Sequence, residues 1–138
     1  MLTKIDLEKL AEMRLEDAVL LLSAGKASSA YYLAGYSIEL ALKACISKLF
    51  QPNVIPEKGF VSAIHTHSLD TLLKLAGLLP QFNDAAKSDA QFAACWGIVS
   101  KWDEGSRYEF WDPISAATLI QAIRDPAHGV FQWVKMHW

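Results

Sequence analysis

One stretch decides the fold: Ala30-Tyr31-Tyr32-Leu33-Ala34-Gly35-Tyr36-Ser37-Ile38-Glu39-Leu40-Ala41-Leu42-Lys43-Ala44. Its apolar residues recur every three or four positions, which is the spacing of one face of an α-helix. A serine at 28 or 29 is a plausible N-cap, and Pro52 prevents the helix from continuing far beyond Phe50. The pattern therefore predicts a long helix, with Glu39 and Lys43 spaced to pair along its surface.

Helical periodicity also governs the rest of the chain, where four further helices are expected over about 5–23, 68–78, 88–102 and 113–134. Ser88-x-x-Gln91 has the form of a capping box, and Asp112-Pro113 that of an N-cap followed by proline. Pro126 and Gly129 should split the last helix near Asp125. No strand-like alternation occurs, so we predict an all-α, up-and-down bundle of about five helices with a four-helix core, formed by residues 1–138 as a single domain.

Composition limits the classes of function. The 138 residues are 52% hydrophobic, with a net charge of -2 and only three arginines, so they lack the basic stripe of a dedicated duplex binder. The first residues do not form the basic and apolar segments of a signal peptide, and no apolar run is long enough to span a bilayer. We therefore expect a cytoplasmic protein with no membrane association.

Neither a metal nor another cofactor is expected. Cys45 and Cys95 lie within apolar helical patterns, which is typical of reduced core thiols. His65 and His67 are close in sequence, but no Cys, Asp or Glu joins them at a recognised ligand spacing. His67 and Ser68 are more simply explained as polar residues at a helix N-terminus. The phosphate-binding, zinc-protease and nucleophile-elbow motifs are also absent.

Two polar segments are candidate sites. The segment 102–112 holds four aromatic residues and four acids around Arg107, which can bind a phosphate or stack on a base. Alternatively, Arg107 pairs with Glu39 or with an acid of its own loop and fastens that loop to the bundle.

The second segment places Arg124 and His128 on one helix face if the helix continues through Pro126, a pairing that could serve metal-free RNA cleavage. Alternatively, those residues face solvent at a kink.

Three motifs resemble those of HEPN domains. The stretch 30–44 is similar to the second HEPN helix, where residues rich in alanine and tyrosine lead into a Glu-x-x-x-Lys step, here Glu39 and Lys43. His67 followed by Leu69 resembles the His-x-Leu start of the third helix. Ser106-Arg107-Tyr108 resembles the Arg-Tyr step before the last helix. The order and spacing of these motifs cover nearly the whole chain.

The resemblance implies a bundle of four to five helices that is often dimeric. Some members of the family are ribonuclease toxins encoded beside a nucleotidyltransferase-like antitoxin, and others bind nucleotides or act as accessory modules. The ribonuclease members carry an arginine and a histidine separated by four to six residues. Here Arg124 and His128 are separated by three, which favours a non-catalytic role.

The leading functional hypothesis is therefore a binding or accessory module for a nucleotide, another phosphate-bearing ligand or a nucleotidyltransferase-like partner. Its expected binding residues are Glu39, Lys43, His67, Arg107 and Tyr108. A ribonuclease toxin that uses Arg124 and His128, with RNA as its substrate, is the second hypothesis, and a purely structural dimer is the third. Five tryptophans and the apolar tail 131–138 lead us to expect a homodimer.

Overall fold

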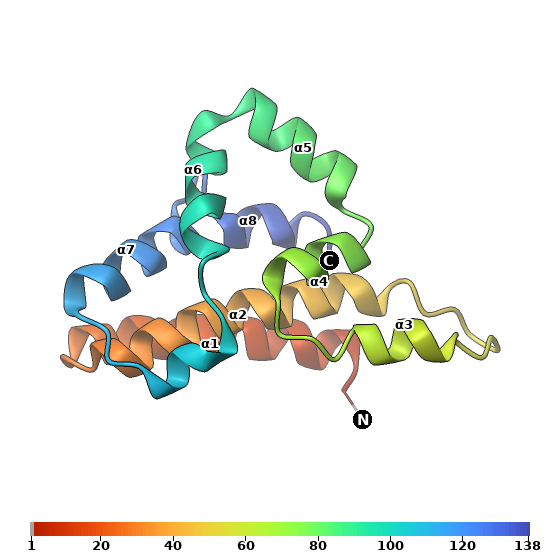
Figure 1. The fold of residues 1–138 in the computed structure, drawn as a ribbon, viewed down its shortest axis with the longest axis horizontal. Helices are drawn as coiled ribbons and strands as arrows, with labels where there is room; N and C mark the ends of the chain where they lie inside the picture. The colour runs from red at the N-terminus through yellow and green to blue at the C-terminus, as the bar shows by residue number, and fades with distance from the viewer. Residues whose placement is uncertain (1) are drawn as a thin grey trace.

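The structure is a computed structural model that describes residues 2–138. Eight α-helices and one short 3-10 helix follow one another over those residues, with no β-strand among them (Figure 1). The all-α prediction is confirmed, but about five helices was too low a number. The elements are α1 (Lys4–Ser23), α2 (Ala27–Ser47), α3 (Lys58–Ala63), α4 (Leu69–Leu75), α5 (Leu79–Ser88), α6 (Ala90–Val99), the 3-10 helix η1 (Glu104–Tyr108), α7 (Pro113–Arg124) and α8 (Val130–Lys135).

The two long helices α1 and α2 form an antiparallel hairpin. Thr3 and Asp6 make a capping box at the start of α1. Gly25, two residues after the end of α1, has a φ of +78°, the left-handed conformation that commonly ends a helix. The expected serine cap of α2 is wrong: the helix begins at Ala27 without a side-chain cap, and the Ser28 hydroxyl instead accepts a hydrogen bond from the Trp111 backbone N–H, 2.8 Å away.

Two short helices were not predicted. The six-residue α3 lies within the connection 51–66, where Gly59 and the short length leave little periodic signal. The second, α5, has Pro80 in its first turn. Proline is well tolerated there because the first N–H groups of a helix have no intrahelical acceptor. The preceding helix α4 ends earlier than expected, at Leu75.

The helix caps observed in the C-terminal half match the predicted caps only in part. Asp89, rather than Ser88, caps α6, because its carboxylate accepts hydrogen bonds from the N–H groups of Gln91 and Phe92. Asp112 caps α7 as predicted, with its Oδ1 atom 2.8 Å from the Ser115 nitrogen. The predicted split near Asp125 is also confirmed, since α7 ends at Arg124 and α8 begins at Val130.

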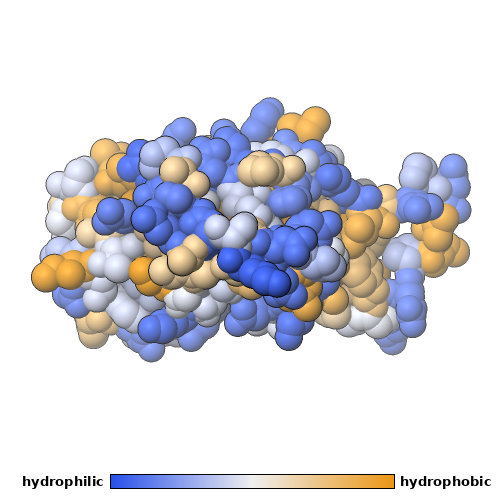
Figure 2. Space-filling model, turned by 90° about the horizontal axis from the view of Figure 1, so that it is seen from above, coloured by the Kyte–Doolittle hydropathy of each residue, from blue (hydrophilic) through white to orange (hydrophobic). Residues whose placement is uncertain are grey.

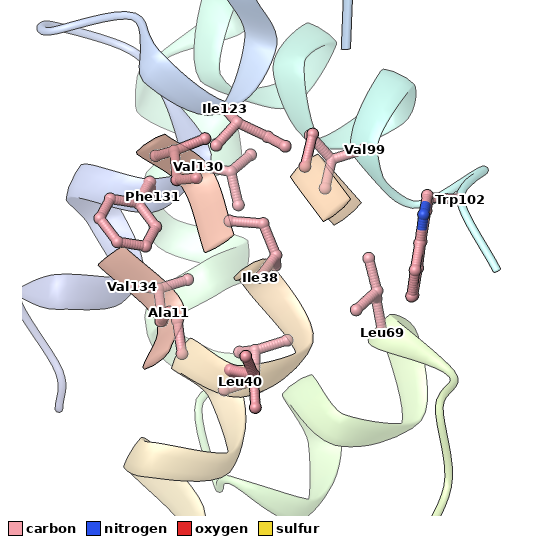
Figure 3. Close-up of a cluster of buried hydrophobic side chains, with 14 of the residues drawn as sticks. Ala11, Ile38, Leu40, Leu69, Val99, Trp102, Ile123, Val130, Phe131 and Val134 are labelled. Carbon is pink, nitrogen blue, oxygen red and sulfur yellow. The ribbon is translucent and has the colours of Figure 1, made fainter. Parts of the chain in front are cut away.

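The helices surround α2, which contacts α1, α4, α7, α8 and η1. In Figure 1, α7 and α8 lie above the α1–α2 hairpin, α4 lies in front of α2, and α5 and α6 form an arch over the top. Figure 3 shows how buried side chains from different helices meet in this space. Its labelled members are Ala11, Ile38, Leu40, Leu69, Val99, Trp102, Ile123, Val130, Phe131 and Val134. Since α2 is packed on several sides, its side chains can reach segments that are distant in sequence.

The C-terminal tail packs back onto the bundle. Trp133 contacts the rings of Phe82 and Phe92, and Trp138 contacts Phe131 edge to face. These contacts account for the apolar character of the tail. Cys45 is buried beside the same helix, and burial raises the pKa of its thiol to about 11.

Apolar side chains that remain exposed are found mainly in loops and at helix ends. Figure 2 shows hydrophobic groups on the protrusion formed by the α2–α3 connection, where Val54 and Ile55 are largely exposed. Tyr108, Phe110 and Ile114 form a second exposed group around η1 and the start of α7. Among the described residues, no helix combines the length and hydropathy needed to cross a bilayer.

Candidate functional site

A buried carboxylate on α2 is the centre of the candidate site. Glu39 is only 2% exposed, and both of its oxygens have a partner. Lys43, one helical turn later, places its Nζ atom 3.3 Å from Oε2, and His67 places its Nδ1 atom 2.9 Å from Oε1. Because an unpaired carboxylate is costly to bury, these two contacts are what allow Glu39 to lie inside the bundle.

The contacts continue outward from His67. Its other ring nitrogen, Nε2, lies 3.0 Å from Oε2 of Glu104, and Oε1 of Glu104 lies 3.0 Å from Nη1 of Arg107. Five side chains from three segments thus form one row, which we call the ion-pair chain: Lys43, Glu39, His67, Glu104 and Arg107. Its members differ in exposure: Glu39 is buried, whereas the side chains of His67 and Arg107 are each 43% exposed.

Two aromatic contacts hold η1 beside α2. The buried ring of Trp102 packs directly against Gly35, where a Cβ atom would lie 2.2 Å from the indole. At the other end of the segment, Trp111 stacks on Tyr31 with ring centroids 3.7 Å apart. Tyr31 and Gly35 lie one turn apart on α2, so the two tryptophans fix both ends of the segment that carries Glu104 and Arg107.

The N-terminus of α4 places His67. Ser68 caps that helix, with its Oγ atom 3.3 Å from the Thr71 nitrogen. The capping role expected of Ser68 is therefore present, whereas His67 contacts Glu39 and Glu104 instead of the helix end. Within residues 2–138, no three Cys, His, Asp or Glu side chains converge in a way that could hold a metal ion.

Arg107 lines a small hollow beside the ion-pair chain. The hollow has a volume of about 250 Å³ and is lined by Ser28, Ser29, Tyr32, Leu33 and Arg107; we call it the Arg107 hollow. The Arg107 guanidinium also lies 4.8 Å from the ring centroid of Tyr108, which is 78% exposed. A cation, hydroxyl groups and aromatic rings therefore meet at one accessible place.

Four of the five predicted binding residues, Glu39, Lys43, His67 and Arg107, lie in the ion-pair chain, and Tyr108 lies beside its end. The direct pairing of Arg107 with Glu39 is not present, because His67 and Glu104 lie between them. Arg107 pairs instead with an acid of its own segment. Glu104 was not singled out from the sequence, although its i,i+3 spacing from Arg107 is a usable signal.

Arg124 and His128 do not share a helix face. Because α7 ends at Arg124, the helix continuation through Pro126 on which their pairing depended is absent. The Asp125 carboxylate accepts the His128 backbone N–H at 2.7 Å and turns the chain. The His128 ring is directed to α6, with Nδ1 2.7 Å from Oδ2 of Asp89. This hydrogen bond lowers the pKa of Asp89 and raises that of His128.

Arg124 instead lines a groove that the sequence did not predict. The groove has a volume of about 630 Å³ and lies between α1, α7 and α8. Apolar residues such as Leu20 and Phe131 line it together with charged groups, among them the pair formed by Lys135 and Glu12, whose nitrogen and oxygen lie 2.9 Å apart. Three helices that are distant in sequence form these walls, so no local pattern could reveal the groove.

Comparison with known proteins identifies the family. The model of the HEPN domain matches residues 6–136. This chain belongs to the HEPN family. Comparisons with curated proteins and with solved structures gave no match. The three sequence motifs that resemble HEPN domains supply Glu39, Lys43, His67 and Arg107, and in this member of the family those residues meet in the ion-pair chain.

Proposed function

We propose that this HEPN domain is a non-catalytic binding module that takes a nucleotide or a similar phosphate-bearing ligand at the Arg107 hollow. The observation that supports this most is the position of Arg107, whose half-exposed guanidinium lines the hollow beside the hydroxyl-bearing side chains of Ser29 and Tyr32. Its carboxylate partner, Glu104, is shared with His67. Arg107 therefore retains hydrogen-bond donors for an incoming phosphate, which a guanidinium can bind through two parallel bonds.

The aromatic residues around the hollow suit the rest of a nucleotide. A volume of about 250 Å³ is below the range of roughly 300–1,000 Å³ that is common for ligand pockets, so the hollow accommodates only part of such a ligand. Tyr108 lies outside it with an exposed ring, and a stacked base typically gains about 1–3 kcal/mol on such a ring. We propose that the phosphate contacts Arg107 and that the base stacks on Tyr108.

The second hypothesis, metal-independent RNA cleavage, receives less support. It needs an arginine and a histidine that act on one phosphate, and here the His128 ring is directed to Asp89 while Arg124 faces the groove beside α1. A nucleotidyltransferase-like partner stays part of the proposal, since the exposed Tyr108, Phe110 and Ile114 offer such a protein an apolar contact next to the Arg107 hollow.

The proposal is tested by titrating the protein with AMP, ADP and ATP in a calorimeter and comparing Arg107→Ala with the unchanged chain. Loss of a charge-assisted contact worth about 1.5–3 kcal/mol should weaken binding by about 10- to 100-fold. Melting should change by only a few degrees, because exposed ion pairs of this kind contribute about 0.2–1 kcal/mol.

Arg14→Ala is a matched control. Arg14 also pairs with an acid three residues away, Asp17, with nitrogen and oxygen 3.0 Å apart, and it does not line the hollow. It should therefore lose a similar ion pair and keep full affinity. Equal binding by the unchanged chain and Arg107→Ala, or no binding of any of the three nucleotides, would contradict the proposal.

A further inference from the structure

The imidazole of His67 lies between two carboxylates. Its Nδ1 atom is 2.9 Å from Oε1 of Glu39, and its Nε2 atom is 3.0 Å from Oε2 of Glu104. Both are hydrogen-bond distances. The two acids come from different elements, α2 and η1, so the ring is a bridge between the buried helix and the segment that carries Arg107.

The number of hydrogens on the imidazole ring limits the protonation states that allow both hydrogen bonds. A neutral imidazole has one N–H and one bare nitrogen, whereas an ionised carboxylate can only accept. Both contacts can be hydrogen bonds at once only if both ring nitrogens carry hydrogen. We propose that His67 bridges the two carboxylates as an imidazolium, that this bridge positions Glu104, and that loss of the bridge weakens anion binding at Arg107.

The charges around His67 agree with this assignment. In the imidazolium form the ion-pair chain alternates in sign, with three cations, Lys43, His67 and Arg107, and two anions, Glu39 and Glu104. The row then has an excess positive charge, which favours an anion at its exposed end. Tyr36 on α2 also faces these groups: burial and then the charge of Glu39 raise the pKa of its phenol, so it stays neutral there.

Loss of one of the two hydrogen bonds of this bridge should release Glu104 rather than Glu39. Glu39 is 2% exposed and depends on its protein partners, whereas the side chain of Glu104 is 30% exposed and can be solvated by water. The remaining N–H therefore stays with Glu39. Glu104 is then paired with Arg107 alone, and it competes with a phosphate for the guanidinium. This consequence for affinity rests on the proposed function, but the protonation of the bridge does not.

The bridge is tested by nuclear magnetic resonance on protein labelled with ¹⁵N in its histidine rings. We expect both His67 nitrogens to carry hydrogen in the folded, unchanged chain. In Glu104→Gln, the amide N–H can donate to a bare Nε2, so a hydrogen on Nε2 is no longer required for this contact. A bare ring nitrogen at about pH 6 in the folded, unchanged chain, with one of the carboxylates protonated in its place, would overturn the inference.

The effect on affinity is tested with cyclic AMP, whose phosphodiester carries one negative charge. One unit charge several ångströms away in a high dielectric changes affinity by about threefold, so His67→Gln should bind cyclic AMP about threefold more weakly than the unchanged chain.

The two proposals can fail separately. If cyclic AMP does not bind at any pH while both His67 nitrogens are protonated, the proposed function fails and the imidazolium bridge stands. If the unchanged chain and His67→Gln bind cyclic AMP with the same affinity, the control of Arg107 by His67 is wrong, whatever the resonance spectra show.

Discussion

Gly35→Ala is the most direct test of how the candidate site is held in place. Gly35 lies within α2, and the ring of Trp102 covers it. A Cβ atom added at this position would lie 2.2 Å from Cγ of the indole and 2.3 Å from both Cδ1 and Cδ2. Since atoms in folded proteins do not approach so closely without a bond, the substitution requires the indole to move.

The indole has little room to move. Trp102 is 2% exposed, and Tyr32 packs against it with ring centroids 5.9 Å apart. Overpacking of this kind costs about 1–3 kcal/mol or more, and the better helix propensity of alanine offsets about 1 kcal/mol. We expect a net loss of about 2 kcal/mol, which lowers the melting temperature of a domain this size by about 5–10 °C.

Gly97→Ala is the matched control for this experiment. Gly97 also lies within a helix, α6, but a Cβ atom there would have no neighbour within 4 Å. This variant should therefore gain the full propensity of about 1 kcal/mol and melt a few degrees higher than the unchanged chain. Calorimetric melting of both variants gives the comparison. If Gly35→Ala is as stable as Gly97→Ala, the packing of Trp102 on α2 is wrong.

Two further predictions concern pH and assembly. The hydrogen bond between Asp89 and His128 raises the pKa of the histidine from 6.5. The stability that the protonated histidine contributes is therefore present below pH 6.5 and is lost as pH rises through the folded-state pKa. The same bond lowers the pKa of Asp89 from 3.8, and the stability that the ionised carboxylate contributes is lost as pH falls. The melting difference between the unchanged chain and His128→Gln should thus be largest at about pH 5 and shrink toward pH 8. For assembly, we predict a homodimer in which exposed groups such as Phe110 contact the partner, since exposed apolar patches commonly mark interfaces. Light scattering that shows only monomer at high micromolar concentration would contradict it.

The long helices could be predicted from the sequence because each has several turns of regular apolar spacing and a recognisable end. The expected span 5–23 differs from α1 by one residue, and Asp112-Pro113 located the start of α7. The short helices α3 and α5 could not be predicted, since six to ten residues with a glycine or an early proline show no clear helical periodicity. Tertiary packing rather than local propensity stabilises such elements.

The sequence predicted most of the residues of the candidate site, but not how they contact one another. Glu39 and Lys43 are paired by helical spacing, but nothing local indicates that His67 lies between two acids or that Arg107 reaches Glu39 only through Glu104. Those contacts depend on where η1 packs against α2. The same reasoning explains the error over Arg124 and His128, because the helix that was expected to join them ends at Arg124, before it reaches His128.

The bond between Ser28 and Trp111 has a consequence for folding during synthesis. These residues are 83 positions apart, and the hydroxyl of Ser28, in the first turn of α2, accepts the Trp111 N–H. A ribosome adds about 5–20 residues per second, so Trp111 is synthesised several seconds after Ser28. During synthesis, the contact between the start of α2 and Trp111 therefore forms only after most of the chain has been made.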